Sequence, residues 1–78
     1  MVINSEYLKS VGMEIKIARI RKGFSILQLA KQTGLSKGSL HRLEQGKHDF
    51  RILTLKRIAD ALEVYLNDLL VTLPSEKR

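Results

Sequence analysis

The segment SILQLAKQTGLSKGSLHRLEQG, residues 25–46, carries the strongest local structural signals in the chain. Ser25 and Gln28 have the spacing of a capping box, in which two side chains satisfy free backbone amides at the start of a helix. Gly34 marks the end of that helix, because glycine readily adopts the left-handed conformation found just after a helix. Ser36 then follows as the cap of another helix. The segment therefore predicts a short helix, a tight glycine turn and a second short helix.

Helical spacing of apolar residues continues on both sides of this segment. We expect a first helix over about 7–22 or 11–22, a fourth helix starting near Thr54 and a last helix over 64–71. Strand signals are almost absent, because the chain lacks sustained alternation and has no Asn-Gly or Asp-Gly hairpin turn. The predicted fold class is therefore all-α, with five helices in a single domain.

The chain of 78 residues is long enough for one domain with a modest core, because a domain of this size buries only about 60% of the surface that its unfolded chain exposes. We expect the domain over residues 11–73, with residues 1–10 as an N-terminal segment or an extension of the first helix and residues 74–78 as a polar tail. The absence of cysteine excludes disulfides and thiolate metal sites. No signal peptide or membrane-length apolar stretch is present, so we expect a cytoplasmic protein with no membrane partner.

The net charge of +6 is distributed unevenly along the chain. Between Lys16 and Arg57, eleven Lys and Arg residues are accompanied by only two acids, Glu44 and Asp49. Over residues 58–73 the balance reverses, with acids and no Lys or Arg. This segregation indicates one face that binds a polyanion and another kept away from it. Nucleic acid fits better than a membrane surface, because turns interrupt the basic stretch.

The helix, turn and helix are accompanied by further residues in a fixed order over three quarters of the chain. The residues that keep this order and spacing are Arg19, Gly23, Ser25, Leu29, Ala30, Gly34, Leu35, Ser36, Leu40, Leu43, Glu44, Gly46, Thr54, Leu55, Ile58, Ala59, Ala61, Leu62, Leu69 and Leu70. The pattern resembles the phage repressor and Cro (Xre) family of helix-turn-helix domains, which includes restriction-modification controller proteins and antitoxins. This resemblance implies a lambda-repressor-like fold whose third helix lies in the major groove of double-stranded DNA.

The resemblance also implies a structural ion pair between Arg19 and Glu44, joining the first and third helices. The alternative for Arg19 is a contact with a DNA phosphate. Removal of either partner from a partly buried pair leaves a charge unmatched, at a cost of about 3–5 kcal/mol. We therefore expect this pair to act in folding rather than in recognition.

The outer side of the third helix supplies the candidates for reading bases. Leu40 and Leu43 are expected to point inward, which leaves the other side free for the groove. Arg and Lys donate to guanine O6 and N7, although each of these positions can also be an ordinary solvated one. Gly38 marks either a close approach of the backbone to DNA or a tolerated glycine in the first turn. The residues expected to contact bases are Lys37, Ser39, His41 and Arg42.

Phosphate contacts are expected at the start of the second helix, from Lys37 near the start of the third helix, and in the loop after the third helix. A helix N-terminus presents free backbone amides to anions, and the loop after the third helix is rich in cations. Side chains of this kind position a protein on DNA without reading its sequence. The residues expected to contact phosphates are Ser25, Gln28, Lys47, His48 and Arg51.

The last helix is more apolar than a monomer of this size requires. We expect a homodimer that binds a palindromic operator as a transcriptional repressor or autoregulator. For the individual leucines, an ordinary place in the core is the alternative. The residues assigned to the dimer interface are Tyr65, Leu66, Leu69, Leu70 and Leu73.

Some apolar residues depart from the family pattern. Ile26 and Leu27 stand where the family usually has a polar residue, and Phe50 stands where it often has proline. These three either pack within the chain or bind a protein partner, as in an antitoxin or adaptor subunit. Ile17 and Ile20 fall off the main buried stripe of the first helix, and we expect the N-terminal segment to cover them.

Catalysis and metal binding are not expected. Ser39 and His41 are two positions apart on a helix, so their side chains do not face each other. Two histidines and no cysteine make a poor set of metal ligands. We expect no cofactor and no small-molecule ligand, and the predicted partners are double-stranded DNA and a second copy of the chain.

Overall fold

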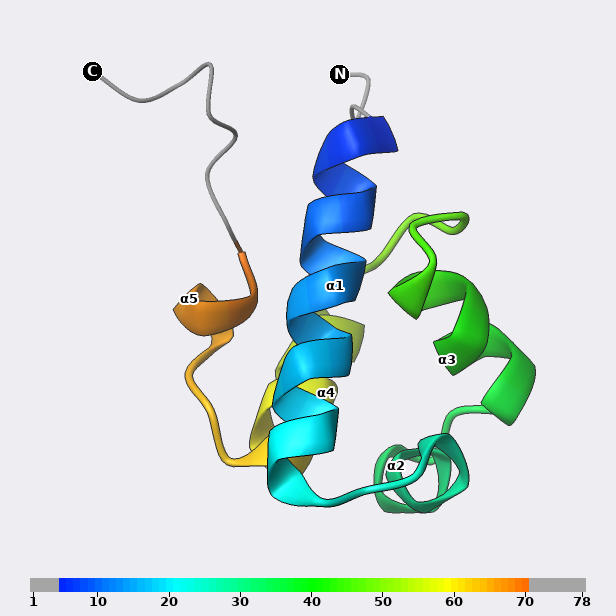
Figure 1. The fold of residues 1–78 in the computed structure, drawn as a ribbon, viewed down its shortest axis with the longest axis vertical. Coiled ribbons are helices and arrows are strands. Elements are labelled where there is room, and N and C mark those ends of the chain that lie inside the picture. The colour runs from blue at the N-terminus through cyan, green and yellow to red at the C-terminus, as the bar shows by residue number, and fades with distance from the viewer. Residues whose placement is uncertain (1–4, 71–78) are drawn as a thin grey trace.

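The computed structural model describes residues 5–70, and within that range the chain forms five helices and no strand. The helices are α1 (Ser5–Lys22), α2 (Ile26–Thr33), α3 (Lys37–Glu44), α4 (Ile52–Leu62) and α5 (Leu66–Leu69). Figure 1 shows α1 as the long central helix, with α2 and α3 on one side of it, α5 on the other side and α4 behind it. The prediction of an all-α domain with five helices is confirmed.

The first helix begins earlier than the shorter of its two predicted ranges. It starts at Ser5, so of the two alternatives for residues 1–10, the extension of the first helix describes residues 5–10. Tyr7 and Leu8 therefore belong to the same helix as Ile17 and Ile20, about 15 Å away along its axis. The expectation that this segment covers Ile17 and Ile20 is wrong, and Ile20 is 58% exposed.

Two other helices differ from their predicted ranges. α4 begins at Ile52, earlier than expected, because Arg51 occupies the N-cap position without a side-chain cap that could mark it in the sequence. The last helix begins later than expected, because the N–H of Val64 donates to the carbonyl of Ala59 (3.0 Å) and so belongs to the end of α4. The predicted end of that helix, Val71, lies outside the described residues.

All five helices contribute to one apolar core. α1 packs against α3, α4 and α5, while α2 packs against α3 and α4. The buried apolar residues are Val11, Ile15, Leu29, Ala30, Leu40, Leu43, Leu55, Ile58, Ala59, Leu62 and Leu69. Of the helices in residues 5–70, none is long and apolar enough to cross a lipid bilayer.

α1 and α3 approach each other closely at Gly12. A Cβ atom added to this glycine would lie 2.3 Å from the carbonyl oxygen of Leu43 and 2.6 Å from that of Glu44, far inside van der Waals contact. Glycine within a helix costs about 1 kcal/mol relative to alanine. Here it allows the end of α3 to pack directly on the backbone of α1.

Candidate nucleic-acid interface

The start of α2 is fixed by the capping box that its sequence predicts. The Ser25 hydroxyl accepts a hydrogen bond from the Gln28 N–H (3.1 Å), and the Gln28 side-chain oxygen accepts one from the Ser25 N–H (2.7 Å). The helix ends at Gly34, which has a left-handed φ of 77° and donates its N–H to Ala30 (2.9 Å). A glycine is favoured here because other residues pay a steric penalty at such a φ.

Side-chain hydrogen bonds then fix the turn that leads into α3. The Thr33 hydroxyl donates to the carbonyl of Leu29 (2.8 Å) and accepts from the N–H of Leu35 (3.3 Å). The Ser36 oxygen caps α3 by accepting from the Ser39 N–H (3.0 Å), and its hydroxyl donates to that of Ser39 (2.9 Å). These bonds hold α3 in a defined orientation relative to α2.

α3 has one buried side and one open side. Leu40 and Leu43 are buried in the core. Ser39 is half-buried, and its hydroxyl accepts the bond from the N-cap described above. The exposed residues of the open side and the cap that follows it are Lys37, Gly38, His41, Arg42 and Gln45. Three of the four predicted base-contacting residues therefore reach solvent freely.

A pocket of about 140 Å³ lies between α3 and the loop that follows it. Its lining residues are Leu35, Ser39, Leu43, His48, Asp49, Phe50, Arg51 and Thr54. The structure thus brings together three predicted DNA contacts, Ser39, His48 and Arg51. Ser25 and Gln28 are exposed at the start of α2 and do not line this pocket.

The charges around the turn are mostly cations without partners, and Asp49 is an acid among them. Elsewhere, Lys56 pairs with Asp60 (2.6 Å), and the Lys22 ammonium pairs with Glu63 and lowers the pKa of that carboxyl. Among the described residues, no group of three or more His, Cys, Asp or Glu side chains could hold a metal ion. The exposed cations that have no ion-pair partner within residues 5–70 are Lys9, Lys16, Arg21, Lys31, Lys37, Arg42, Lys47, Arg51 and Arg57, and those from Lys31 to Arg51 lie on α2, α3 and the loop that follows.

Arg19 and Glu44 are in direct contact between α1 and the end of α3. Nε and one terminal nitrogen of Arg19 donate to the two Glu44 oxygens at 2.7 and 3.1 Å. The other terminal nitrogen donates to the carbonyl of Phe24 (2.9 Å). Every nitrogen of this guanidinium therefore has a partner within the fold.

Arg57 lies near the turn and is not among the site residues predicted from the sequence. A Cβ atom built on Gly34 would lie 3.2 Å from a terminal nitrogen of Arg57, so α4 places a guanidinium group beside the turn. The motif leaves this position unspecified, and no local pattern marks it. Its position depends on the packing of α2 against α4.

The apolar residues that depart from the family pattern pack mostly within the chain. Ile26 is half-buried against the core. Phe50 also packs there, with its ring centroid 6.4 Å from that of Tyr7. Only Leu27, at 50% exposed, presents much of its surface to solvent. Of the two alternatives, packing within the chain therefore describes Ile26 and Phe50, and Leu27 is the most exposed of the three.

The predicted dimer interface also needs correction. Leu69 is 1% exposed and belongs to the chain's own core, so it offers no surface to a partner. Leu66 and Leu70 are half-buried against the same core, while Tyr65 is 81% exposed. Leu73 lies outside the described residues.

The sequence of the chain is similar to sequences of known helix-turn-helix proteins. Residues 15–69 match the family HTH_3, described as helix-turn-helix. Over 60 residues the chain is 42% identical to SlrR, an HTH-type transcriptional regulator of Bacillus subtilis, and the match covers 76% of this chain and 40% of SlrR. The chain thus spans about two fifths of the length of that regulator.

The fold of the chain is also similar to the folds of solved bacterial regulators. The restriction-modification controller protein C.AhdI from Aeromonas hydrophila is similar with a TM-score of 0.77 and 26% identity, over 80% of this chain and 94% of that protein. The clp gene regulator ClgR from Corynebacterium glutamicum is similar with a TM-score of 0.80 and 26% identity, over 82% of each chain.

Proposed function

The chain belongs to the helix-turn-helix family HTH_3, a family of DNA-binding transcriptional regulators, and from this premise we propose that it reads a specific double-stranded DNA sequence through α3. The membership confirms the resemblance to phage repressors and controller proteins. The observation that carries the proposal is the set of exposed, unpaired cations on α2, α3 and the following loop. As a regulator of this kind, the protein is expected in the cytoplasm with the DNA that it reads.

In this proposal α3 enters the major groove with its open side toward the bases. Lys37 and Arg42 donate to guanine, and Arg42 can bond O6 and N7 at once. His41 lies between them on the exposed side and adds a further donor or acceptor. Ser39 contributes through a hydroxyl that the N-cap already orients.

The phosphate contacts on either side of α3 fix its position in the groove. Ser25 and Gln28 lie at the N-terminus of α2, where the helix dipole attracts an anion. Lys47, His48 and Arg51 approach a phosphate from the loop after α3. Each phosphate that a cation neutralises adds about 0.9 to the slope of log affinity against log salt concentration.

Two copies binding a palindromic operator complete the proposal. Tyr65, Leu66 and Leu70 form the part of the α5 face left open by the burial of Leu69, and we assign them to the twofold contact. A symmetric dimer of this kind reads half-sites about 34–36 Å apart. A regulator of this type represses transcription by occupying DNA at a promoter, including that of its own gene.

Selection of bound fragments from a pool of random duplex DNA, at defined salt, tests sequence-specific binding. We expect enrichment of one palindromic sequence with half-sites one helical turn apart. Enrichment of a single half-site would contradict binding as a dimer, but it would still agree with base recognition by α3. If no sequence were enriched, specific recognition itself would be wrong.

A further inference from the structure

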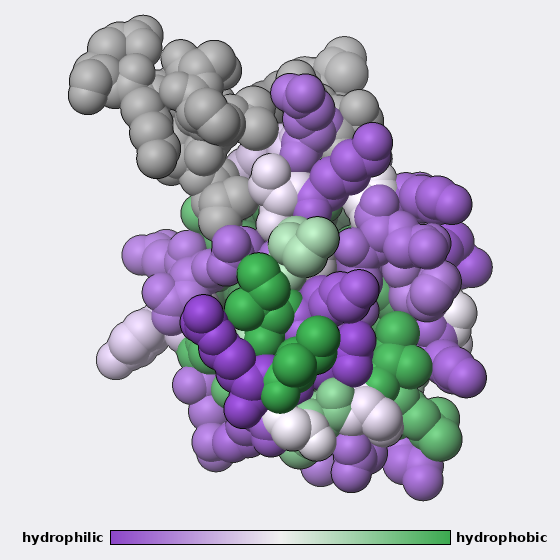
Figure 2. Space-filling view, viewed as in Figure 1, coloured by the Kyte–Doolittle hydropathy of each residue, from purple (hydrophilic) through white to green (hydrophobic). Residues whose placement is uncertain are grey.

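α1 is apolar on two opposite sides. Val11 and Ile15 are buried in the core, whereas Met13 and Ile20 are 51% and 58% exposed. Ile17 is half-buried and follows Met13 by one turn, so the three residues form a line that we call the α1 stripe. Figure 2 shows hydrophobic side chains along the front of α1 with hydrophilic ones on either side. A helix at the surface of a globular domain normally has one apolar face, so a second one indicates a partner.

The α1 stripe continues into a groove of about 540 Å³ between α1 and the corner where α4 meets α5. Ile17 belongs to both the stripe and the groove. The half-buried Val64 adds apolar surface to the groove from the other side, whereas Leu62 and Leu69 line it but are buried in the core. The apolar surface is therefore wider than a single line of side chains on one helix.

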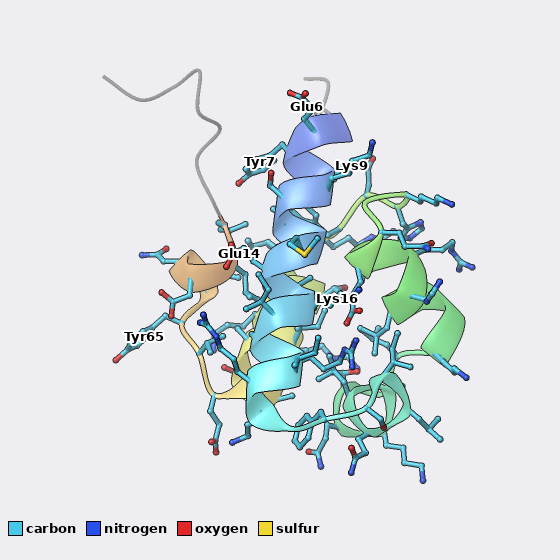
Figure 3. All side chains as sticks on the ribbon, in the orientation of Figure 1. Glu6, Tyr7, Lys9, Glu14, Lys16 and Tyr65 are labelled. Atoms are coloured by element: carbon cyan, nitrogen blue, oxygen red, sulfur yellow. The ribbon has the colours of Figure 1, made fainter. Side chains whose placement is uncertain are left out.

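Two unpaired charges of opposite sign flank the α1 stripe on its groove side. Glu14 and Arg21 both line the groove, and they are two helical turns, or about 10 Å, apart along α1. Neither has an ion-pair partner among the described residues. Figure 3 shows Glu14 on one side of α1 and Lys16 on the other, where the exposed ammonium remains in water.

We propose that the α1 stripe packs against the α1 stripe of a second copy of this chain, with the two helices antiparallel. Reversal of direction places Met13 of one copy near Ile20 of the other, with Ile17 at the crossing point. The same reversal brings Glu14 of each copy toward Arg21 of the other. Two reciprocal ion pairs then flank the apolar contact, as twofold symmetry requires, and they set its orientation. This contact is centred on α1 and not on the exposed face of Tyr65, Leu66 and Leu70, and it goes beyond the DNA-binding function.

Sedimentation equilibrium of the full chain without DNA tests the apolar part of this contact. We expect concentration-dependent association that Ile20→Ser weakens at least tenfold. Leu27→Ser on α2 is the matched control, because Leu27 is 50% exposed and lies away from the stripe, and it should leave the association unchanged. A wild-type chain that remains monomeric, or equal effects of the two changes, would overturn the proposal.

Charge reversal tests whether the occupant is a second copy. Glu14→Arg and Arg21→Glu should each weaken the association, because each brings like charges together, and the double variant should restore it. Failure of the double variant to recover would overturn the reciprocal arrangement. A lower melting temperature of monomeric Ile20→Ser, measured at concentrations below association, would instead assign the stripe to another segment of the same chain. None of these results bears on sequence recognition by α3, so the α1 contact and DNA recognition fail independently. A monomeric wild-type chain would also contradict the twofold contact at α5, whereas an effect confined to the α1 variants would not.

Discussion

The guanidinium of Arg19 in α1 binds both carboxylate oxygens of Glu44, the last residue of α3, and the two side chains are only 13% and 6% exposed. The other end of α3 is held by the cap at Ser36. The proposed DNA-reading helix is therefore fixed to the domain at both of its ends. A change at either end should alter the position of the whole helix, and not only the side chain that is replaced.

Glu44→Ala should destabilise the domain even in the absence of DNA. The change leaves a partly buried guanidinium without its carboxylate, which costs about 3–5 kcal/mol. Since each kcal/mol lowers the melting temperature of a small domain by about 4–8 °C, thermal unfolding followed by circular dichroism should show a loss above about 10 °C. Lys56→Ala, which breaks the exposed pair with Asp60, should change little. An unchanged melting point for Glu44→Ala would contradict a structural role.

Gly12→Ala should also destabilise the fold, although alanine is the better helix former. The added Cβ atom would overlap the carbonyl oxygens of Leu43 and Glu44, so α3 would have to move away from α1. Overpacking of this kind costs about 1–3 kcal/mol. Chemical denaturation should show a lower free energy of unfolding, and an increase would show that the two helices separate freely.

Gly38→Ala separates folding from DNA binding. A Cβ atom at this position meets only the Arg42 guanidinium, at an ordinary 3.6 Å, so the fold does not require glycine here. The change should stabilise the domain by up to about 1 kcal/mol through helix propensity. If Gly38 allows a close approach to DNA, affinity for the selected operator should fall at least tenfold in a fluorescence titration. Unchanged affinity would make Gly38 a tolerated glycine in the first turn.

The exposed pair between Lys22 and Glu63 should give a pH-dependent contribution to stability. The nearby ammonium lowers the pKa of Glu63 below its ordinary value of 4.5, mainly through the side-chain hydrogen bond. The folded state therefore holds this proton less tightly than the unfolded state, and the stabilisation is present above pH 4.5 and is lost as the pH falls through the lowered pKa. The wild-type protein should have a higher melting temperature than the Lys22→Met variant at neutral pH, and the two melting temperatures should be equal at about pH 2. An equal difference in melting temperature at both pH values would contradict a contribution from the ionised Glu63.

The elements predicted correctly from the sequence have local signals. The capping box of Ser25 and Gln28 and the glycine at 34 each depend on neighbours within a few residues, so α2 and the turn could be read directly. Leu69 and Arg57 illustrate the limit. The burial of Leu69 depends on how α5 packs against α1 and α4. The position of Arg57 beside the turn depends on how α4 packs against α2.

The pattern on α1 illustrates the same limit in another way. Apolar residues on two sides of a helix are visible in the sequence, and the side of Val11 and Ile15 is the buried one, but what covers the other side is not visible. From the sequence, the N-terminal segment is expected to cover Ile17 and Ile20. Because residues 5–10 continue the helix, Tyr7 and Leu8 cannot fold back over them.

Arg42→Ala and Lys47→Ala should affect DNA binding in different ways. Arg42 lies on the open side of α3, where it can reach base edges, whereas Lys47 follows the helix in the loop. Arg42→Ala should therefore lose about 1–3 kcal/mol for the selected operator and relax the preference at one base position. Lys47→Ala should weaken binding to all sequences alike and lower the salt slope by about 0.9. Titrations of the operator and its single-base variants at several salt concentrations measure both effects, and a uniform loss for Arg42→Ala would reassign that residue to a phosphate contact.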